Sequence, residues 1–305
     1  MTRPAALDPG RRAELLAEAQ ALRPELHRYC ARLMGSVIEG EDVVQDALVR
    51  ALAALDRLDE APPLRPRLFR IAHNRALDLL RGRTLRRTEP IDAAFEVPDP
   101  ESPDPEAALL RREAVGSAVS RFAELPVGQR SVVILKDVMG EPLLDIAGLL
   151  DLSVDAVKGQ LARGRARLRE VNARPSPPPA VRPASPEVAR YVALFNRGDW
   201  DGLRALLADD VRLHQSLHPL REGRADVGLF FSIYANLPQV RLAPAWLGDR
   251  EVIAAFDGRG ARPASLMWLE WRNGRIRLIR DTRYLPYFLA DAELVLPPGA
   301  SPAAP

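Results

Sequence analysis

Residues 143–169, with the sequence LLDIAGLLDLSVDAVKGQLARGRARLR, decide the fold of the centre of the chain. Apolar residues recur at three- and four-residue spacing on both sides of a three-residue gap, which predicts a short helix over Leu143–Leu150 and a longer helix over Val154–Arg169. Ser153 is placed to cap the second helix, and the small Ala147 allows the two helices to cross closely. The stretch therefore predicts a helix-turn-helix.

The longer helix has one apolar and one basic side. Val157 and Leu161 face inward, and the opposite face carries cations and polar groups. A helix of this kind fits the major groove of DNA, where its first turns contact base edges and its later cations contact phosphates. A plain helical hairpin with a solvated arginine face is the open alternative. We assign base contacts to Asp155, Lys158 and Gln160, and phosphate contacts to Arg163, Arg165 and Arg167.

Two proline-rich stretches without helical periodicity, residues 88–105 and 172–186, divide the chain into three blocks. The first block, residues 13–87, and the second, residues 106–171, carry helical periodicity. The third, residues 187–296, opens with helices and ends in strand-like runs, which predicts an α+β domain. The predicted helices are Leu22–Met34, Glu41–Leu58, Arg67–Gly82, Ala107–Leu125, Gly128–Met139, Glu187–Phe195 and Trp200–Leu207, and the predicted strands include Ala264–Trp271 and Arg275–Asp281.

Composition limits the class of protein. The 305 residues are 47% apolar and 28% charged, which is typical of folded globular chains. Cys30 is the only cysteine, so the chain has no intrachain disulfide and no multi-cysteine zinc site. No apolar run approaches the length of a membrane span or of a signal peptide core. We therefore expect a cytoplasmic protein that binds no membrane, no metal and no cofactor.

Charge is distributed unevenly along the first block and the linker behind it. The segment from Arg65 to Arg87 holds eight arginines against one acid, Asp78, which predicts a phosphate-binding surface with Phe69, His73 and Asn74 available for bases. The linker that follows is acidic and contains no basic residue, so it is either a solvated spacer or a functional tether.

A second patch lies on the predicted helix Glu41–Leu58. Asp42, Gln45 and Asp46 are spaced i, i+3 and i+4, opposite the apolar stripe of the helix. This acidic, amide-bearing patch fits a basic partner helix.

Three stretches of the first two blocks resemble the extracytoplasmic-function sigma factors of RNA polymerase. GEDVVQDALVRAL (40–52) is similar to their polymerase-binding segment, and LFRIAHNRALDLLR (68–81) is similar to their promoter-melting helix. LPVGQRSVVILKDVMG (125–140), together with the helix-turn-helix, resembles their fourth conserved region. The matches occur in order over residues 20–170 and imply two all-α sigma domains, the second with the helix-turn-helix.

The resemblance implies a role for each patch. Asp42, Gln45 and Asp46 would face the β′ clamp helices of core RNA polymerase, and the β flap of the polymerase would be a further partner of the chain. The acidic linker would thread the polymerase channel. The helix Leu68–Arg81 and the loop Asp59–Pro66 would hold the melted minus-ten strand of promoter DNA, and Val154–Arg167 would contact the minus-thirty-five element. The minus-ten residues are Arg67, Phe69, Arg70, His73, Asn74 and Arg81.

Two positions depart from the family pattern. Arg67 lies where relatives commonly carry an aromatic residue, so strand-separating stacking is weaker or is supplied by Phe69. Gln160 lies where many relatives carry arginine, so the upstream promoter specificity does not transfer.

The third block resembles another family. VARYVALFNRGDWDGLRALLADDV (188–211) and GRIRLIRDTRY (274–284) are similar to the first helices and last strand of SnoaL-like domains of the nuclear-transport-factor superfamily. These domains are α+β cones around a pocket, and relatives include isomerases and cyclases with a pocket carboxylate as base. The candidate pocket residues are His214, Tyr234, Trp246 and Asp281. The alternative is structural: Asp281 pairs with an arginine, His214 lies on a strand and Trp246 belongs to the core.

We expect a promoter-directing initiation factor that is not an enzyme. Residues 185–296 contain 15 arginines against 14 acids, so the third block lacks the basic bias of a DNA-binding module. By resemblance it is a fused regulator in place of a separate anti-sigma protein, with an unidentified small ligand as a candidate partner. Two alternatives remain open: a free-standing helix-turn-helix regulator, and a bifunctional protein with a catalytic pocket.

Overall fold

The computed structural model describes residues 9–55, 63–84, 105–175, 182–216, 218–237, 239–258, 260 and 262–297. The chain forms two compact units, divided between Pro175 and Ser176. The acidic linker lies outside the described residues apart from Pro105, and so does the first half of the loop Asp59–Pro66. Within the described ranges, no helix is both long and apolar enough to cross a membrane.

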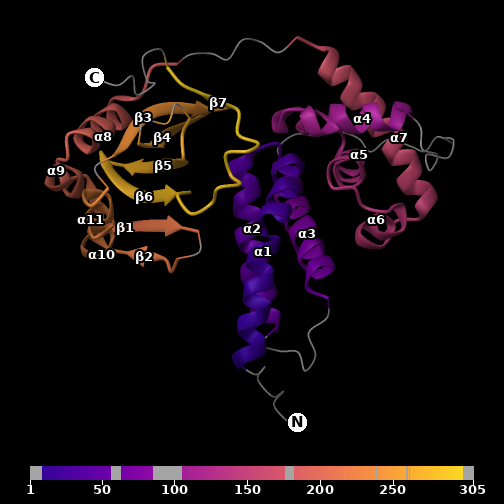
Figure 1. Cartoon of the computed structure of the whole chain (residues 1–305), viewed down its shortest axis with the longest axis horizontal. Coiled ribbons are helices and arrows are strands. Elements are labelled where there is room, and N and C mark those ends of the chain that lie inside the picture. The colour runs from indigo at the N-terminus through magenta and orange to yellow at the C-terminus, as the bar shows by residue number, and fades with distance from the viewer. Residues whose placement is uncertain are drawn as a thin grey trace. The chain divides into compact units, whose positions relative to one another are not determined.

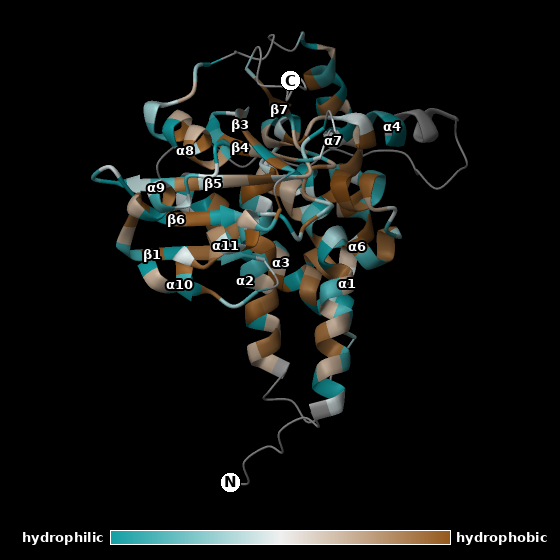
Figure 2. Cartoon of the chain, turned by 60° about the vertical axis from the view of Figure 1, so that its left-hand side comes forward, coloured by the Kyte–Doolittle hydropathy of each residue, from teal (hydrophilic) through white to brown (hydrophobic). Residues whose placement is uncertain are grey.

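Three helices form the first half of the helical unit: α1 (Pro9–Met34), α2 (Val37–Leu55) and α3 (Leu64–Thr84) (Figure 1). α1 begins well before the predicted Leu22 because Leu15 and Ala19 are buried and continue its apolar stripe. In Figure 2, hydrophobic and hydrophilic colours alternate along α1, as expected of a helix with one buried side.

The second half of the helical unit differs in one element from the prediction. A single helix over Ala107–Leu125 is wrong, because the helix ends at Gly116 and a 3-10 helix begins at Val119. Between them, the Ser117 hydroxyl donates a hydrogen bond to the backbone of the preceding turn and accepts one from Asn172, which replaces helical bonding. The elements of this half are α4 (Pro105–Gly116), η1 (Val119–Glu124), α5 (Val127–Val133), the π-helical turn η2 (Ile134–Val138), α6 (Leu143–Leu150) and α7 (Val154–Ala173).

The predicted helix-turn-helix is present in α6 and α7. The hydroxyl of Ser153 accepts a hydrogen bond from the backbone N–H of Ala156 at 3.1 Å, so Ser153 caps α7 as expected. Asp151 ends α6 in the left-handed conformation, with φ of 56°. Val157 and Leu161 are buried, which fixes the inward side of α7.

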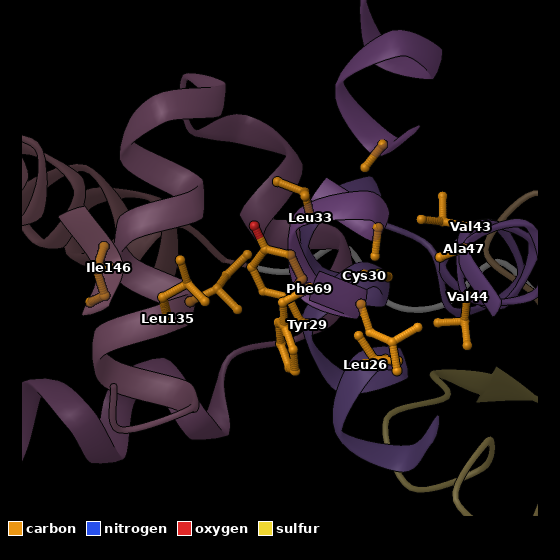
Figure 3. Close-up of a cluster of buried hydrophobic side chains, with 14 of the residues drawn as sticks. Leu26, Tyr29, Cys30, Leu33, Val43, Val44, Ala47, Phe69, Leu135 and Ile146 are labelled. Carbon is orange, nitrogen blue, oxygen red and sulfur yellow. The ribbon is translucent and has the colours of Figure 1, made fainter. Parts of the chain in front are cut away.

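One hydrophobic core joins the two halves of the helical unit. Tyr29 and Leu33 of α1 and Phe69 of α3 belong to the same buried cluster as Leu135 of η2 and Ile146 of α6. Figure 3 shows these side chains together, with Leu135 and Ile146 on one side of Tyr29. The two helical blocks therefore pack as one body.

The C-terminal unit has the predicted α+β composition. Its seven-stranded sheet has the order β2-β1-β6-β5-β4-β3-β7, in which β1 and β6 pair in parallel and the other neighbours are antiparallel. The strands are β1 (Leu207–Gln215), β2 (Arg221–Glu222), β3 (Val240–Leu247), β4 (Arg250–Asp257), β5 (Ser265–Arg272), β6 (Arg275–Asp281) and β7 (Leu294–Val295), and the helices are α8 (Pro186–Asn196), α9 (Trp200–Ala205), α10 (Arg224–Gly228) and α11 (Phe230–Ala235).

The helices of this unit fill one face of the sheet with aromatic side chains. Tyr191 and Phe195 of α8 and Phe230, Phe231 and Tyr234 of the α10–α11 region share a core with the strands. These rings therefore form the core between the helices and the inner side of the sheet.

Candidate polymerase and nucleic-acid interface

The acidic patch predicted on α2 exists, but two of its members already have arginine partners. Asp42, Gln45 and Asp46 are all partly exposed on one side of the helix. The Gln45 side-chain oxygen accepts a hydrogen bond from Arg23 at 2.7 Å, and the Asp46 carboxylate accepts one from Arg75 at 2.8 Å. Two guanidinium groups therefore hold Gln45 and Asp46 in place at the surface of α2.

Sequence reasoning missed a buried ion pair behind this patch. Arg23 of α1 contacts the carboxylate of Glu41 of α2, and their side chains are only 3% and 5% exposed. A buried guanidinium is costly unless its charge and hydrogen-bond donors are compensated, and Glu41 does so here, so the pair fixes α1 against α2. The signal was available, because Arg23 lies beside Leu22 and Leu26 within an otherwise apolar helix face.

Two of the predicted minus-ten residues are buried rather than available for bases. Phe69 is 3% exposed and packs against Tyr29, with ring centroids 5.6 Å apart. His73 is 7% exposed, and its Nδ1 shares a hydrogen bond with the Tyr29 hydroxyl at 2.7 Å. Burial, followed by the charge of Arg81, lowers the pKa of His73 to about 4. Both side chains belong to the core in this structure, and the base contacts expected of Phe69 and His73 stay predictions.

The other four minus-ten candidates lie at the surface of α3. Arg70, Asn74 and Arg81 are exposed, and Arg67 is partly exposed. Arg70 donates a hydrogen bond to the carbonyl of Gly148 in α6 at 2.6 Å. Arg81 approaches Asp78 at 3.9 Å, a distance at which the side chain stays largely solvated. These four residues form a basic surface, which we call the α3 basic face.

One residue of α7 that we expected to contact phosphate, Arg165, is largely buried. Arg165 forms two hydrogen bonds with Asp137, at 2.6 and 2.9 Å, and their side chains are 12% and 0% exposed. The expected placement of Arg165 on the exposed face is therefore wrong, because a fully buried carboxylate requires this cation. Asp155 is exposed, and the partly exposed residues are Lys158, Gln160, Arg163 and Arg167.

The side chain of Gln160 is only partly exposed and lies close to α5. A Cβ atom added to Gly128 would lie 3.4 Å from the side-chain nitrogen of Gln160. At the same crossing, a Cβ on Gly164 would lie 2.6 Å from Val133, so only glycine fits there. Gln160, one of the three residues of α7 that we expect to contact bases, therefore lies next to Gly128 of α5.

In the C-terminal unit, two of the four candidate pocket residues meet. Asp281, which is 2% exposed, accepts hydrogen bonds from the Tyr234 hydroxyl, the Gln215 amide and the backbone N–H of Arg283, each at 3.0 Å. Burial raises the pKa of Asp281, and its three donors oppose that shift. These bonds tie the parallel pair β1–β6 to α11, which is a structural role.

The other two candidate pocket residues, His214 and Trp246, do not meet Asp281. His214 precedes Gln215 on β1, so its side chain points to the opposite face of the sheet, where burial lowers the pKa of its imidazole. Trp246 donates its indole N–H to the carbonyl of Arg182 at 3.1 Å, and the Arg182 guanidinium lies 5.2 Å from its ring centre. Trp246 therefore anchors the end of the proline-rich linker and does not line a pocket with Asp281.

Comparisons with known proteins match all three blocks. Residues 19–86 match the Sigma-70 region 2 model, residues 118–168 the Sigma-70 region 4 model and residues 188–279 the SnoaL-like domain model. The ECF RNA polymerase sigma factor SigG of Mycobacterium tuberculosis is 33% identical over 220 residues, which are 63% of this chain and 59% of SigG. The RNA polymerase sigma factor CnrH of Cupriavidus metallidurans is 36% identical over 135 residues, which are 42% of this chain and 70% of CnrH.

A solved structure is similar over a longer range. The extracytoplasmic function sigma factor SigJ of Mycobacterium tuberculosis is 22% identical, with a TM-score of 0.34, and the match covers 91% of this chain and 99% of SigJ. The chain spans less than two thirds of the length of SigG.

The chain thus has two helical blocks, the second with a capped helix-turn-helix and each with basic side chains at its surface, followed by an α+β domain. The chain belongs to the ECF sigma factors of RNA polymerase, and its C-terminal block is a SnoaL-like domain. The curated relatives are named as sigma factors and not as enzymes.

Proposed function

We propose that this chain binds core RNA polymerase and directs it to specific promoters. One observation carries the proposal: a single helical unit presents a preorganised acidic patch on α2, the α3 basic face and a Ser153-capped α7, all within the two matched sigma regions. Each surface has the charge that its partner requires, because a basic protein helix pairs with carboxylates and DNA phosphates pair with guanidinium groups.

In this proposal, Asp42, Gln45 and Asp46 bind the β′ clamp helices, and the second helical block also meets the β flap. The α3 basic face holds the minus-ten strand, while Asp155, Lys158 and Gln160 approach bases of the minus-thirty-five element. Arg163 and Arg167, which lie four residues apart on one side of α7, contact phosphates. The acidic linker threads the polymerase channel.

A free-standing DNA-binding regulator is the rival proposal, and one variant separates the two. Asp42→Ala, Gln45→Ala and Asp46→Ala together should abolish binding to core polymerase while leaving the circular dichroism spectrum and binding to isolated DNA unchanged. Glu14→Ala with Glu18→Ala, which removes two exposed acids of α1, is the matched control and should bind polymerase normally. A triple variant that still binds core polymerase would contradict the role of the patch, and a wild-type chain that binds DNA but never binds core polymerase would support the regulator instead.

We further propose that the C-terminal unit regulates initiation and does not catalyse a reaction. Asp281, the only candidate base that meets another candidate, already accepts hydrogen bonds from three donors, so its oxygen atoms are occupied by the fold. In-vitro transcription with core polymerase on a promoter library, comparing the full chain with a chain ending at Arg174, tests the regulatory role. Identical output and promoter choice from both chains would contradict it.

A further inference from the structure

The large apolar side chains that the C-terminal unit exposes lie at one place. In the part of this unit that the structure describes, only Leu220, Leu229 and Tyr284 are large, apolar and exposed, by 45%, 59% and 36%. Leu220 precedes β2, and Leu229 follows α10, which lies beside β2 (Figure 1). Single exposed apolar side chains are ordinary, but a group of them marks a binding surface. The surface between β2 and the α10–α11 junction is therefore a candidate for binding.

This surface contains a hollow of about 520 Å³. Leu220 lines it from the side of β2, and Leu229 lines it from the helical side together with Ile233, one turn later on α11. His218 also lines the hollow, and its ring centre lies 4.4 Å from that of Tyr284. Small-molecule sites in proteins have volumes of about 300–1,000 Å³ and mostly apolar walls. The hollow has both properties.

The hollow lies beside the aromatic core of the unit and not within it. Phe230 and Tyr234 of α11 are buried in that core. Leu229 and Ile233 each come one residue earlier, so they are turned by about 100° from the inward side of the helix. Among the described residues, neither Tyr234 nor Asp281 lines the hollow. A molecule could therefore bind there while the hydrogen bonds of Asp281 stay intact.

Two opposite charges at the hollow indicate what kind of molecule it takes. Arg221 is partly exposed and Asp226 is exposed, and neither forms an ion pair within the ranges that the structure describes. A guanidinium group binds a carboxylate through two parallel hydrogen bonds. The Asp226 carboxylate accepts hydrogen bonds only, so it favours a molecule with an amine and disfavours one with several negative charges. A molecule with one carboxylate and one amine satisfies both residues.

We propose that this hollow binds a small amino acid-like molecule with a flat, ring-bearing apolar body. The ring lies between Leu220 on one side and Leu229 with Ile233 on the other. The carboxylate of the molecule pairs with Arg221, and its amine donates to Asp226. The binding site does not depend on the sigma function. The further step, in which the bound molecule is the signal for the regulatory unit, rests on the proposed function.

Saturation-transfer NMR on the full chain tests the site with three probes. L-phenylalanine has the ring, the carboxylate and the amine, whereas 3-phenylpropionate lacks the amine and 2-phenylethylamine lacks the carboxylate. Phenylalanine should bind with a Kd of about 1 mM or below, as expected for a ligand of its size. 2-Phenylethylamine should bind at least about tenfold more weakly, because it forms no charge-assisted hydrogen bonds with Arg221.

Variants of the lining assign the binding to this hollow. Arg221→Gln should weaken phenylalanine about tenfold and leave 2-phenylethylamine unchanged. Leu229→Ser should weaken all three probes about fivefold, because it removes apolar wall. The matched controls are Arg190→Gln, an exposed arginine of α8, and Leu144→Ser, an exposed leucine of α6, and both should bind as the wild type does. Circular dichroism checks that each variant is folded.

The outcomes separate the site from the proposed function. Absence of saturation transfer from all three probes, or equal weakening in the control variants, would overturn the site, and a chain that still directed initiation would keep the sigma function. Phenylalanine binding that Arg221→Gln weakens and Arg190→Gln does not would support the site. The site would then stand even if the chain never bound core polymerase, which would sink the sigma function alone.

Discussion

Arg165 and Asp137 form a bidentate ion pair in which the carboxylate side chain has no exposed surface. Asp137 lies on the π-helical turn η2, and Arg165 lies on the inner side of α7. The pair connects α7 to η2, the π-helical turn that follows α5. It therefore holds α7, on which we propose that DNA contacts lie, in a fixed position.

Removing one partner of this pair should destabilise the helical unit strongly. Arg165→Met leaves the Asp137 carboxylate buried and unpaired, which we expect to cost about 3 kcal/mol in the free energy of unfolding. The double variant Asp137→Leu with Arg165→Met should recover most of this loss, because an apolar pair replaces both charges. Urea unfolding, monitored by far-ultraviolet circular dichroism, measures the free energy of unfolding of the single and the double variant. An Arg165→Met chain as stable as the wild type would show that the pair contributes nothing.

The cap of α7 should be replaceable only by another capping residue. Ser153→Ala removes the acceptor for the Ala156 N–H and should lower stability by about 1 kcal/mol, whereas Ser153→Asp should retain it. Promoter affinity should follow the same order, since the capped turn places Asp155 and Lys158. Equal unfolding midpoints for the alanine and aspartate variants would contradict this role.

Local patterns in the sequence predicted the parts of the fold that depend on neighbouring residues. The helix-turn-helix followed from Ser153, Ala147 and the apolar spacing of α6 and α7, and these features act within a few residues of one another. The positions of Arg165, Phe69 and His73 could not be predicted, because their surroundings come from distant segments. Asp137 faces Arg165 from a π-helical turn, whose wider winding changes the direction of side chains relative to a regular helix.

The candidate site also combines features that neighbouring residues determine with features that depend on distant segments. The acidic patch on α2 followed from a spacing of three and four residues, and the structure places it on one side of the helix. The burial of Phe69 depends on the packing of the second block, which no single helix encodes. In the C-terminal unit, the meeting of Asp281 with Tyr234 depends on the pairing of β6 with β1 and on the docking of α11.

Stability of the helical unit should depend on pH through His73. Its pKa in the folded protein is about 4, below the ordinary value near 6.5, so the unfolded chain binds more protons between these values. The contribution of neutral His73 to the free energy of unfolding should therefore be fully present above about pH 6.5. It should fall by up to about 3 kcal/mol as the pH drops from about 6.5 to about 4. His73→Gln, which still accepts from Tyr29, should lose less stability between pH 7 and pH 5. Equal losses in both proteins would rule out His73 as the cause.

The C-terminal unit should show the opposite dependence through Asp281. Burial raises the pKa of this carboxyl in the folded state, so the folded state holds the proton more tightly and stability falls as pH rises above the ordinary aspartate value. Asp281→Asn should remove this slope and leave polymerase-dependent transcription in place. Tryptophan fluorescence isolates the unit, because Trp200, Trp246, Trp268 and Trp271 all lie within it. An unchanged slope in the asparagine variant would assign the dependence to another group.

The salt dependence of DNA binding should distinguish an arginine that contacts phosphate from one that supports the fold. Each phosphate contact releases about one counterion, so Arg167→Gln should reduce the slope of log affinity against log salt by about 0.9. Arg165→Gln should instead lower the unfolding free energy and, in the fraction that remains folded, leave the slope unchanged, because its guanidinium is held by Asp137. Fluorescence anisotropy at several salt concentrations, with the folded fraction measured in parallel, tests both variants. A reduced slope for Arg165→Gln would show that the ion pair opens on DNA and that this arginine does contact the backbone.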